Sequence, residues 1–440
     1  MSAAITKTED VAPPFLTQVA EAITRFGLPV FILCLPLEFT SQILRVQLAR
    51  IVLGAVALAY AYLVAAGVRK VVVPVSASSI ALAALVAFAV LSWLFTRAPG
   101  SLNALADVAL YPIVAVLVVN LSRTESDHRN AWIAFLISGV TIAVLVVFLH
   151  FTHLYIWRPD PERGRVNATF GDPNIAARFL TLTACAGVVL FARRMGVDRL
   201  AAATVAACSA FTAFTLSKSA LLLYPVSVVI STLFAGAQRR TAVIAAVALL
   251  IFGASVLTTP GAEPRVERAF QQIAGGAHLI VSPPASTTNQ QIANSDLDLV
   301  RPYLINAGWQ MFLHDPITGV GFGGYQHSLT TTYKRFLPEQ PPATLSHTGL
   351  VTVLAELGLV GILLFLGFLA LLAREVVISI RLRTPWRSWV VVPAALVLPI
   401  LAYSQVEGRM LEEPYLWLAL GLLYSARALE RSTRTVELPA

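Results

Sequence analysis

A histidine stands at the start of one apolar stretch, directly after the longest polar stretch of the chain. His347 lies in Ser346-His347-Thr348-Gly349, where the sequence predicts the start of a helix near a membrane surface. A histidine in this position can titrate near neutral pH and act as a general base. The alternative is a helix-start histidine that only hydrogen-bonds the adjacent loop. Glu356 falls on the opposite face of the same helix, so we do not expect it to orient His347; it is either a functional carboxylate or one that pairs with another helix.

A second polar group precedes the apolar stretch that begins at Pro173. Asn174 and Arg178 are four residues apart and share one helical face, and Arg165 lies just upstream. Asp172-Pro173 suits the first turn of a helix. A helix N-terminus offers free N–H groups and a partial positive charge. The sequence therefore predicts a phosphate-binding cradle here, and the alternative is a purely structural helix cap.

Further cations lie where charge is not needed to set membrane orientation. Lys218 stands in the short turn Leu216-Ser217-Lys218-Ser219, and Arg265, Arg268 and Arg301 lie in the polar stretch 259–346. They are either solvated loop charges or parts of a shared anion site. Arginine and lysine can bind a phosphate without a metal ion.

Motifs of soluble enzymes are absent from the sequence. It contains no HExxH, no Walker loop, no GxSxG and no dense carboxylate pair for a metal. The glycine-rich stretch 319–325 has no strand before it, so we do not expect it to bind a nucleotide. Cys34, Cys185 and Cys208 lie in apolar runs and are expected to be small core residues. We therefore expect no metal site and no cofactor.

The elements that position these residues are predicted to be membrane-spanning helices. The chain has 440 residues, 57% of them hydrophobic and 13% charged, whereas soluble domains carry about 25% charged residues. Its mean hydropathy is +0.73. Only helices and closed barrels cross a bilayer, and these apolar runs lack the alternation of barrel strands. We therefore expect an all-α polytopic membrane protein with about twelve spans. They are placed near 24–40, 48–67, 78–97, 103–121, 131–153, 173–192, 199–217, 219–237, 241–258, 347–373, 387–405 and 413–429.

The polar stretch divides the chain into three parts. Residues 1–258 hold nine predicted spans, residues 259–346 form one large segment outside the bilayer with short helices, and residues 347–440 hold three spans and a tail. Within the polar segment, Ser295 is expected to cap a helix that ends near Leu313.

The distribution of basic residues predicts the orientation. If the N-terminus is cytoplasmic, the basic turns all fall on the cytoplasmic side, as the positive-inside rule requires. These turns hold Arg69-Lys70, Arg123, Arg129, Arg193-Arg194, Arg199, Arg239-Arg240, Arg374 to Arg387 and the tail arginines from Arg427 onward. The segments 154–172 and 259–346 then face the outside, and both termini are cytoplasmic. The net charge of +8 follows this distribution, so no nucleic-acid partner is expected.

Four motifs in this order resemble the O-antigen ligase and polymerase superfamily. They are the R…F-G-D-P-N pattern of 165–174, Thr215-Leu216-Ser217-Lys218-Ser219, the R…G-W…H-D-P-I-T-G-V-G-F-G pattern of 301–323, and the H-T-G-L…E-L-G-L-V-G pattern of 347–361. Together they cover about residues 160–361, and the lipopolysaccharide O-antigen ligases are the nearest branch. The family's turn motif has arginine where this chain has Lys218, which keeps the charge and loses the bidentate fork.

The resemblance implies a bacterial inner-membrane enzyme similar to the GT-C glycosyltransferases. Such enzymes move a glycan from an undecaprenyl-pyrophosphate carrier to lipid A–core at the periplasmic face, with inversion and without a metal. It implies His347 as the base and supports Lys218 and Arg265 as pyrophosphate ligands. Arg268, Arg301, Arg165, Arg178 and Asn174 are the further ligand candidates. An O-antigen polymerase, a protein O-oligosaccharyltransferase and a transporter of lipid-linked sugars are the alternative functions.

Overall fold

The structure is a computed structural model of the whole chain. It describes residues 14–99, 101–157, 165–236, 238–267, 269–270, 300–333, 346, 348–382, 384–407 and 410–437. Helices and their connections make up these residues, and no strand occurs among them. The predicted all-α membrane class is therefore confirmed, because many of these helices are long and apolar.

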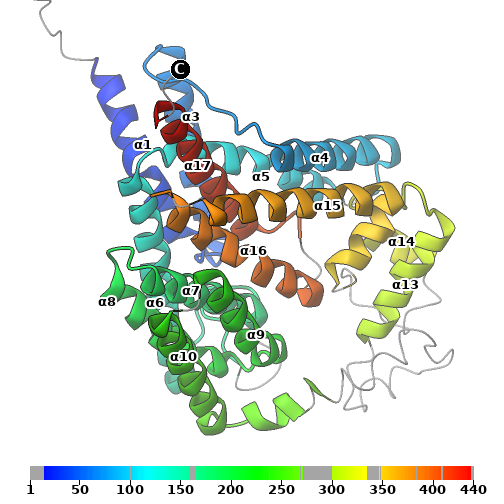
Figure 1. Ribbon diagram of the computed structural model, residues 1–440. Helices are drawn as coiled ribbons and strands as arrows, with labels where there is room; N and C mark the ends of the chain where they lie inside the picture. The colour runs from blue at the N-terminus through cyan, green and yellow to red at the C-terminus, as the bar shows by residue number, and fades with distance from the viewer. Residues whose placement is uncertain are drawn as a thin grey trace, which may run out of the picture.

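Most helices pack into one bundle, from which α13 and α14 project beyond the start of α15 (Figure 1). Ten helices in the described residues are long and apolar enough to cross a membrane. They are α1 (Phe15–Cys34), α3 (Leu48–Ala65), α4 (Ala77–Thr96), α5 (Leu102–Leu121), α6 (Glu125–Thr152), α7 (Pro173–Ala192), α9 (Lys218–Ala235), α10 (Arg239–Thr258), α15 (Gly349–Arg381) and α16 (Arg387–Glu407). The shorter or more polar helices are α2 (Thr40–Leu44), α8 (Asp198–Phe211) with η1 (Thr212–Thr215), α13 (Val300–His314), α14 (Tyr325–Thr331) and α17 (Pro414–Glu437).

The bounds of several predicted spans differ from those of the observed helices. The span predicted at 24–40 is α1, which begins at Phe15 and ends before Pro36, because its first turns are amphipathic and still bury Thr17 and Ala20. The span predicted at 199–217 is α8, which has 14 residues and is continued by η1. The span predicted at 413–429 is α17, whose second half is charged.

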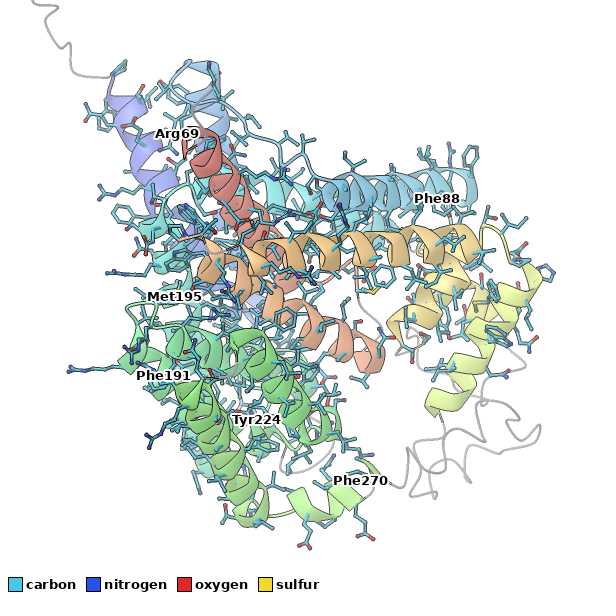
Figure 2. All side chains as sticks on the ribbon, viewed as in Figure 1. Arg69, Phe88, Phe191, Met195, Tyr224 and Phe270 are labelled. Atoms are coloured by element: carbon cyan, nitrogen blue, oxygen red, sulfur yellow. The ribbon has the colours of Figure 1, made fainter. Side chains whose placement is uncertain are left out.

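The bundle is tied together at one end by a buried polar network. Glu375 on α15 accepts hydrogen bonds from the backbone N–H and the hydroxyl of Ser78 on α4, at 3.0 and 2.7 Å. Arg427 of α17 forms an ion pair with the same carboxylate. The start of α4 therefore lies beside the ends of α15 and α17, and Figure 1 shows α4 and α15 running alongside each other. Arg69 and Met195 lie on one side of the molecule, away from Phe270 (Figure 2).

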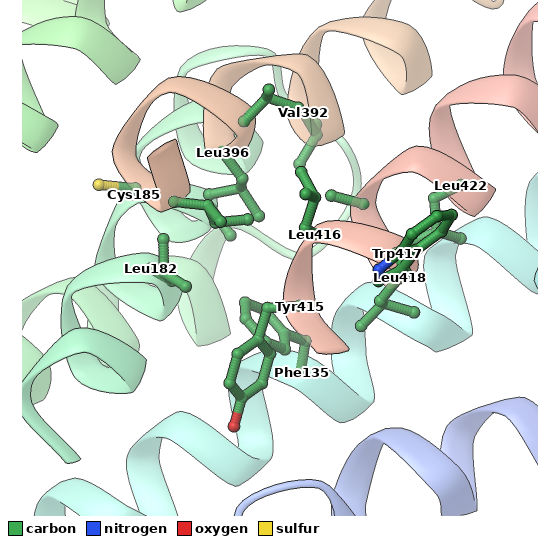
Figure 3. Close-up of a cluster of buried hydrophobic side chains, with 14 of the residues drawn as sticks. Phe135, Leu182, Cys185, Val392, Leu396, Tyr415, Leu416, Trp417, Leu418 and Leu422 are labelled. Atoms are coloured by element: carbon green, nitrogen blue, oxygen red, sulfur yellow. The ribbon is translucent and has the colours of Figure 1, made fainter. Parts of the chain in front are cut away.

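Helix α7 is the centre of the hydrophobic core and is buried along almost its whole length. Around it, Phe135 of α6, Leu396 of α16 and Tyr415 of α17 pack with Leu182 and their neighbours (Figure 3). All three cysteines are buried, as expected for core residues. Because α7 is buried among the other helices, their packing fixes the position of its start. That start carries one of the predicted anion sites.

Helix α15 is broken near its start, where Gly358 adopts φ 59° and ψ −155°. The glycine-rich turn after α13 occupies the break. Val320 N–H and Gly321 N–H donate to the carbonyls of Ala355 and Glu356 at 2.8 and 3.0 Å. A Cβ on Gly358 would lie 2.5 Å from the Ile317 carbonyl, so only glycine fits there. The glycine-rich turn therefore satisfies backbone carbonyls of α15 at the break and stabilises it.

Candidate functional site

The starts of α7 and α9 meet at the end of the bundle opposite to the Glu375 network. Asp172 caps α7 and accepts a hydrogen bond from Asn174 N–H at 2.6 Å. The side-chain oxygen of Asn174 accepts hydrogen bonds from Ser217 Oγ at 2.7 Å and from Arg165 Nη2 at 3.2 Å. Ser217 caps α9, and Lys218 is the first residue of that helix.

This arrangement places three predicted anion ligands, Arg165, Asn174 and Lys218, around two adjacent helix N-termini. Arg165 and Lys218 are partly exposed, as is Asn174. Each helix start adds a partial positive charge and unsatisfied N–H groups to the two cationic side chains. The site can therefore attract and hold an anion such as a phosphate.

The loop that carries Arg165 is held by the connection between α1 and α2. Thr169 Oγ1 donates to the carbonyl of Pro36 at 2.5 Å, and Phe39 N–H donates to the carbonyl of Thr169 at 2.9 Å. Gly171 N–H donates to the carboxylate of Glu38 at 3.4 Å. The position of Arg165 thus depends on residues more than a hundred positions earlier in the chain.

Arg178 lies deeper in the bundle than the rest of the predicted cradle. Its Nη1 is 2.6 Å from Oε2 of Glu413, and their side chains are 5% and 1% exposed. Glu413 directly precedes α17, and the adjacent Tyr415 packs against Phe179 with ring centroids 5.5 Å apart. Arg178 therefore connects the start of α7 to the start of α17.

Arg265 belongs to a helical stretch at 262–267 that follows α10, and it is half-buried. A Cβ on Gly261 would lie 4.0 Å from Leu216 Cδ1. Because Leu216 is two residues from Lys218, this stretch begins beside the start of α9. Arg301 is in the first turn of α13. Arg268 and His347 lie outside the described residues.

The residues on either side of His347 are placed by the end of α16. Ser346 is buried, and its hydroxyl accepts a hydrogen bond from Thr348 N–H at 3.0 Å. At the start of α15, Leu350 N–H donates to Oε1 of Gln405 at 3.1 Å. Two residues earlier in α16, the hydroxyl of Tyr403 is 2.8 Å from Thr181 Oγ1 on α7. Helix α16 therefore connects the start of α15 to the helix that carries Asn174 and Arg178.

Glu356 pairs outside its own helix, with backbone N–H groups at the end of the glycine-rich turn. Its Oε1 accepts the backbone N–H of Tyr325 at 3.1 Å, and its carboxylate also accepts the N–H of Gly323. The carboxylate therefore holds the glycine-rich turn in the break of α15. Tyr325 is fixed at both ends, because its hydroxyl donates to the carbonyl of Leu304 at 2.5 Å. Burial and the nearby Glu356 raise the pKa of the Tyr325 phenol.

Part of the site described above lies in a segment that matches a known protein family. Residues 202–366 match the family model described as O-antigen ligase. This segment is similar to an O-antigen ligase domain. The family is one of glycosyltransferase-like membrane enzymes of the ligase and polymerase type. No curated protein matches the chain.

The segment that matches the O-antigen ligase family contains some of the predicted site residues. Lys218, Arg265, Arg268, Arg301 and His347 lie inside the matched range. Arg165, Asn174 and Arg178 precede it, and Asn174 is joined to it by the hydrogen bond from Ser217. The site is thus built from the matched segment and from helices that precede it.

Sequence reasoning missed two residues that organise the site. Pro414 at the first position of α17 is typical of a helix start, but the pairing of Glu413 with Arg178 has no signal in the sequence. Ser217 could have been recognised as a helix cap in Thr215-Leu216-Ser217-Lys218. Among the described residues, no group of three histidine, cysteine, aspartate or glutamate side chains could hold a metal.

Proposed function

We propose that the protein transfers an O-antigen glycan from undecaprenyl pyrophosphate to a sugar hydroxyl of lipid A–core. The match of residues 202–366 to the O-antigen ligase family carries this proposal. The joined starts of α7 and α9 support it, because a lipid pyrophosphate needs an anion site at the membrane surface. The positive-inside pattern puts this end of the bundle in the periplasm, with both termini in the cytoplasm of the bacterium.

The pyrophosphate is the leaving group, and its developing charge must be stabilised. Lys218 and Arg165 flank Asn174 at two helix N-termini, so they are the first candidates. Arg265 lies on the neighbouring stretch, and Arg268 and Arg301 are further candidates in the polar segment. Fixed donors aimed at a leaving oxyanion lower the barrier because they need no reorganisation during the reaction. Arg178 contributes through its contact with Glu413, which positions α7.

His347 is the proposed general base. The acceptor hydroxyl gives its proton to the imidazole as its oxygen attacks the anomeric carbon of the donor sugar. The bond from that carbon to the pyrophosphate oxygen breaks, and the electron pair leaves on the pyrophosphate. Attack opposite to the leaving group inverts the anomeric configuration. No step in this scheme requires a metal ion, so a chelator should leave the rate unchanged.

The test compares His347→Ala with His327→Ala in purified protein. His327 lies on α14 in the same polar segment, and its backbone carbonyl accepts hydrogen bonds from Thr330 and Thr331, so it is a matched control. General-base catalysis contributes about 10²- to 10⁴-fold, so His347→Ala should lose transfer by that factor while His327→Ala keeps it. Transfer is measured as glycan-capped lipid A–core in proteoliposomes. Normal transfer by His347→Ala would exclude it as the base.

The products of the same assay discriminate among the other functions. An O-antigen polymerase would give longer carrier-bound glycan, and a protein O-oligosaccharyltransferase would need a protein acceptor. A transporter would move the donor across the membrane without forming a glycosidic bond. Any of these three outcomes, with pure protein, both lipids and a protein acceptor present, would replace the ligase assignment.

A further inference from the structure

Helix α13 has two apolar faces, and one of them packs against protein. Leu304, Ala307 and Met311 are buried, and they form a small core with Tyr325 of α14 and Ala355 of α15. These positions share one face of a helix with 3.6 residues per turn. This face holds α13 and α14 against the broken start of α15 (Figure 1).

The opposite face of α13 is also apolar, yet it is exposed. Trp309 and Leu313 are 46% and 52% exposed, and Ile305 and Phe312 are partly exposed. The spacing i, i+4, i+7 and i+8 puts all four on one stripe. The rings of Trp309 and Phe312 lie 5.3 Å apart. A contiguous exposed stripe of large apolar side chains marks an interaction surface.

This stripe continues onto the membrane-spanning surface of α15. Ile317 is 66% exposed and lies four residues after Leu313, just beyond the end of α13. The carbonyls of Pro316 and Ile317 accept hydrogen bonds from Leu359 and Val360 at 2.8 and 3.2 Å, which puts Ile317 beside Leu359. Leu359 begins a row of exposed leucines with Leu363 and Leu366 on the apolar part of that span. This row is an exposed apolar face of a helix that is long and apolar enough to cross a membrane.

We propose that α13 lies in the surface of the bilayer, with its Ile305–Trp309–Phe312–Leu313 stripe among the lipids. A helix that lies at an interface places its lipid-facing apolar side chains about 5–10 Å into the headgroup and acyl boundary. The other apolar face of α13 is covered by α14 and α15. Tryptophan is enriched at this depth because its ring is amphipathic. His314 and Asp315 end the helix with side chains 73% and 48% exposed, suited to the headgroup layer. Lipid is the fitting partner, because the stripe is continuous with the exposed apolar face of α15.

Site-directed fluorescence tests this contact without relying on the transfer reaction. Leu313→Cys and Trp309→Cys carry a small fluorophore in proteoliposomes, and Gln326→Cys on an exposed turn of α14 is the matched control. The native cysteines are all buried, so labelled wild-type protein provides the blank. Quenching is measured with lipids that carry a nitroxide near the headgroup and, separately, with aqueous iodide.

The proposal expects loss of fluorescence at 313 and 309 with the nitroxide lipids and little loss with iodide. The label at 326 should show the reverse. Strong iodide quenching at 313 and 309 would place the stripe in water and overturn the proposal. Protection from both quenchers would assign the stripe to a protein partner, including a second copy of the chain, and would also overturn it.

Discussion

Replacement of the Arg178–Glu413 pair tests whether Arg178 acts on the substrate or on the bundle. The two side chains are 5% and 1% exposed and their atoms are 2.6 Å apart. Unit charges about 4 Å apart attract by about 4 kcal/mol at an effective dielectric constant of about 20. Removal of one partner of a buried pair costs about 3–5 kcal/mol, because the other charge stays buried without compensation.

We therefore expect Arg178→Met and Glu413→Leu each to destabilise the protein by about 3–5 kcal/mol. The double variant should regain most of this loss, because apolar replacement of a whole buried pair is often neutral. Stability is measured as thermal unfolding in detergent, and the coupling is the departure of the double variant from the sum of the two single changes. Ile175→Val, about one turn earlier on α7 at a partly exposed position, is the control for a change in the same helix.

If the double variant loses as much stability as the sum of the two single variants, the reasoning from the ion pair is refuted. Kinetics of the stable double variant then decide the second question. A normal KM for the lipid pyrophosphate would show that Arg178 acts only through Glu413. A raised KM in this variant would show that Arg178 also contacts the donor.

Three further predictions concern the anion site and the break in α15. Lys218→Met should raise the KM for the lipid pyrophosphate, because it removes charged hydrogen bonding worth up to about 3 kcal/mol of binding free energy. Lys218→Arg should keep activity in the same proteoliposome assay. Gly358→Ala should lower the thermal midpoint through a positive-φ cost of about 1–2 kcal/mol and a backbone clash. Gly367→Ala, in open space on the same helix, should not lower it. Glu356→Ala leaves Gly323 and Tyr325 N–H without their acceptor and should cost about 1–3 kcal/mol for each, while Glu356→Gln should cost less by thermal unfolding.

The sequence determined the class of the protein and the kinds of residues at its site. Runs of apolar residues long enough to cross a bilayer predict spans whatever their neighbours are, and the structure has such helices at most of the predicted places. Local motifs predicted the start of α7 at Asp172-Pro173. The predicted start of the first span was wrong, because Glu21 and Arg25 interrupt the apolar run, whereas the helix continues through them from Phe15.

Only the tertiary structure decided which of these residues meet. The bond between Asn174 and Ser217 joins two helix starts 43 positions apart, and the pair of Arg178 with Glu413 spans far more of the chain. No periodicity within one helix encodes such contacts, because they depend on which faces of different helices pack together. The same holds for Glu356, whose partners are backbone N–H groups of a turn that the sequence presents only as a run of glycines. Sequence thus specified the chemistry that is available, and helix packing specified where it is assembled.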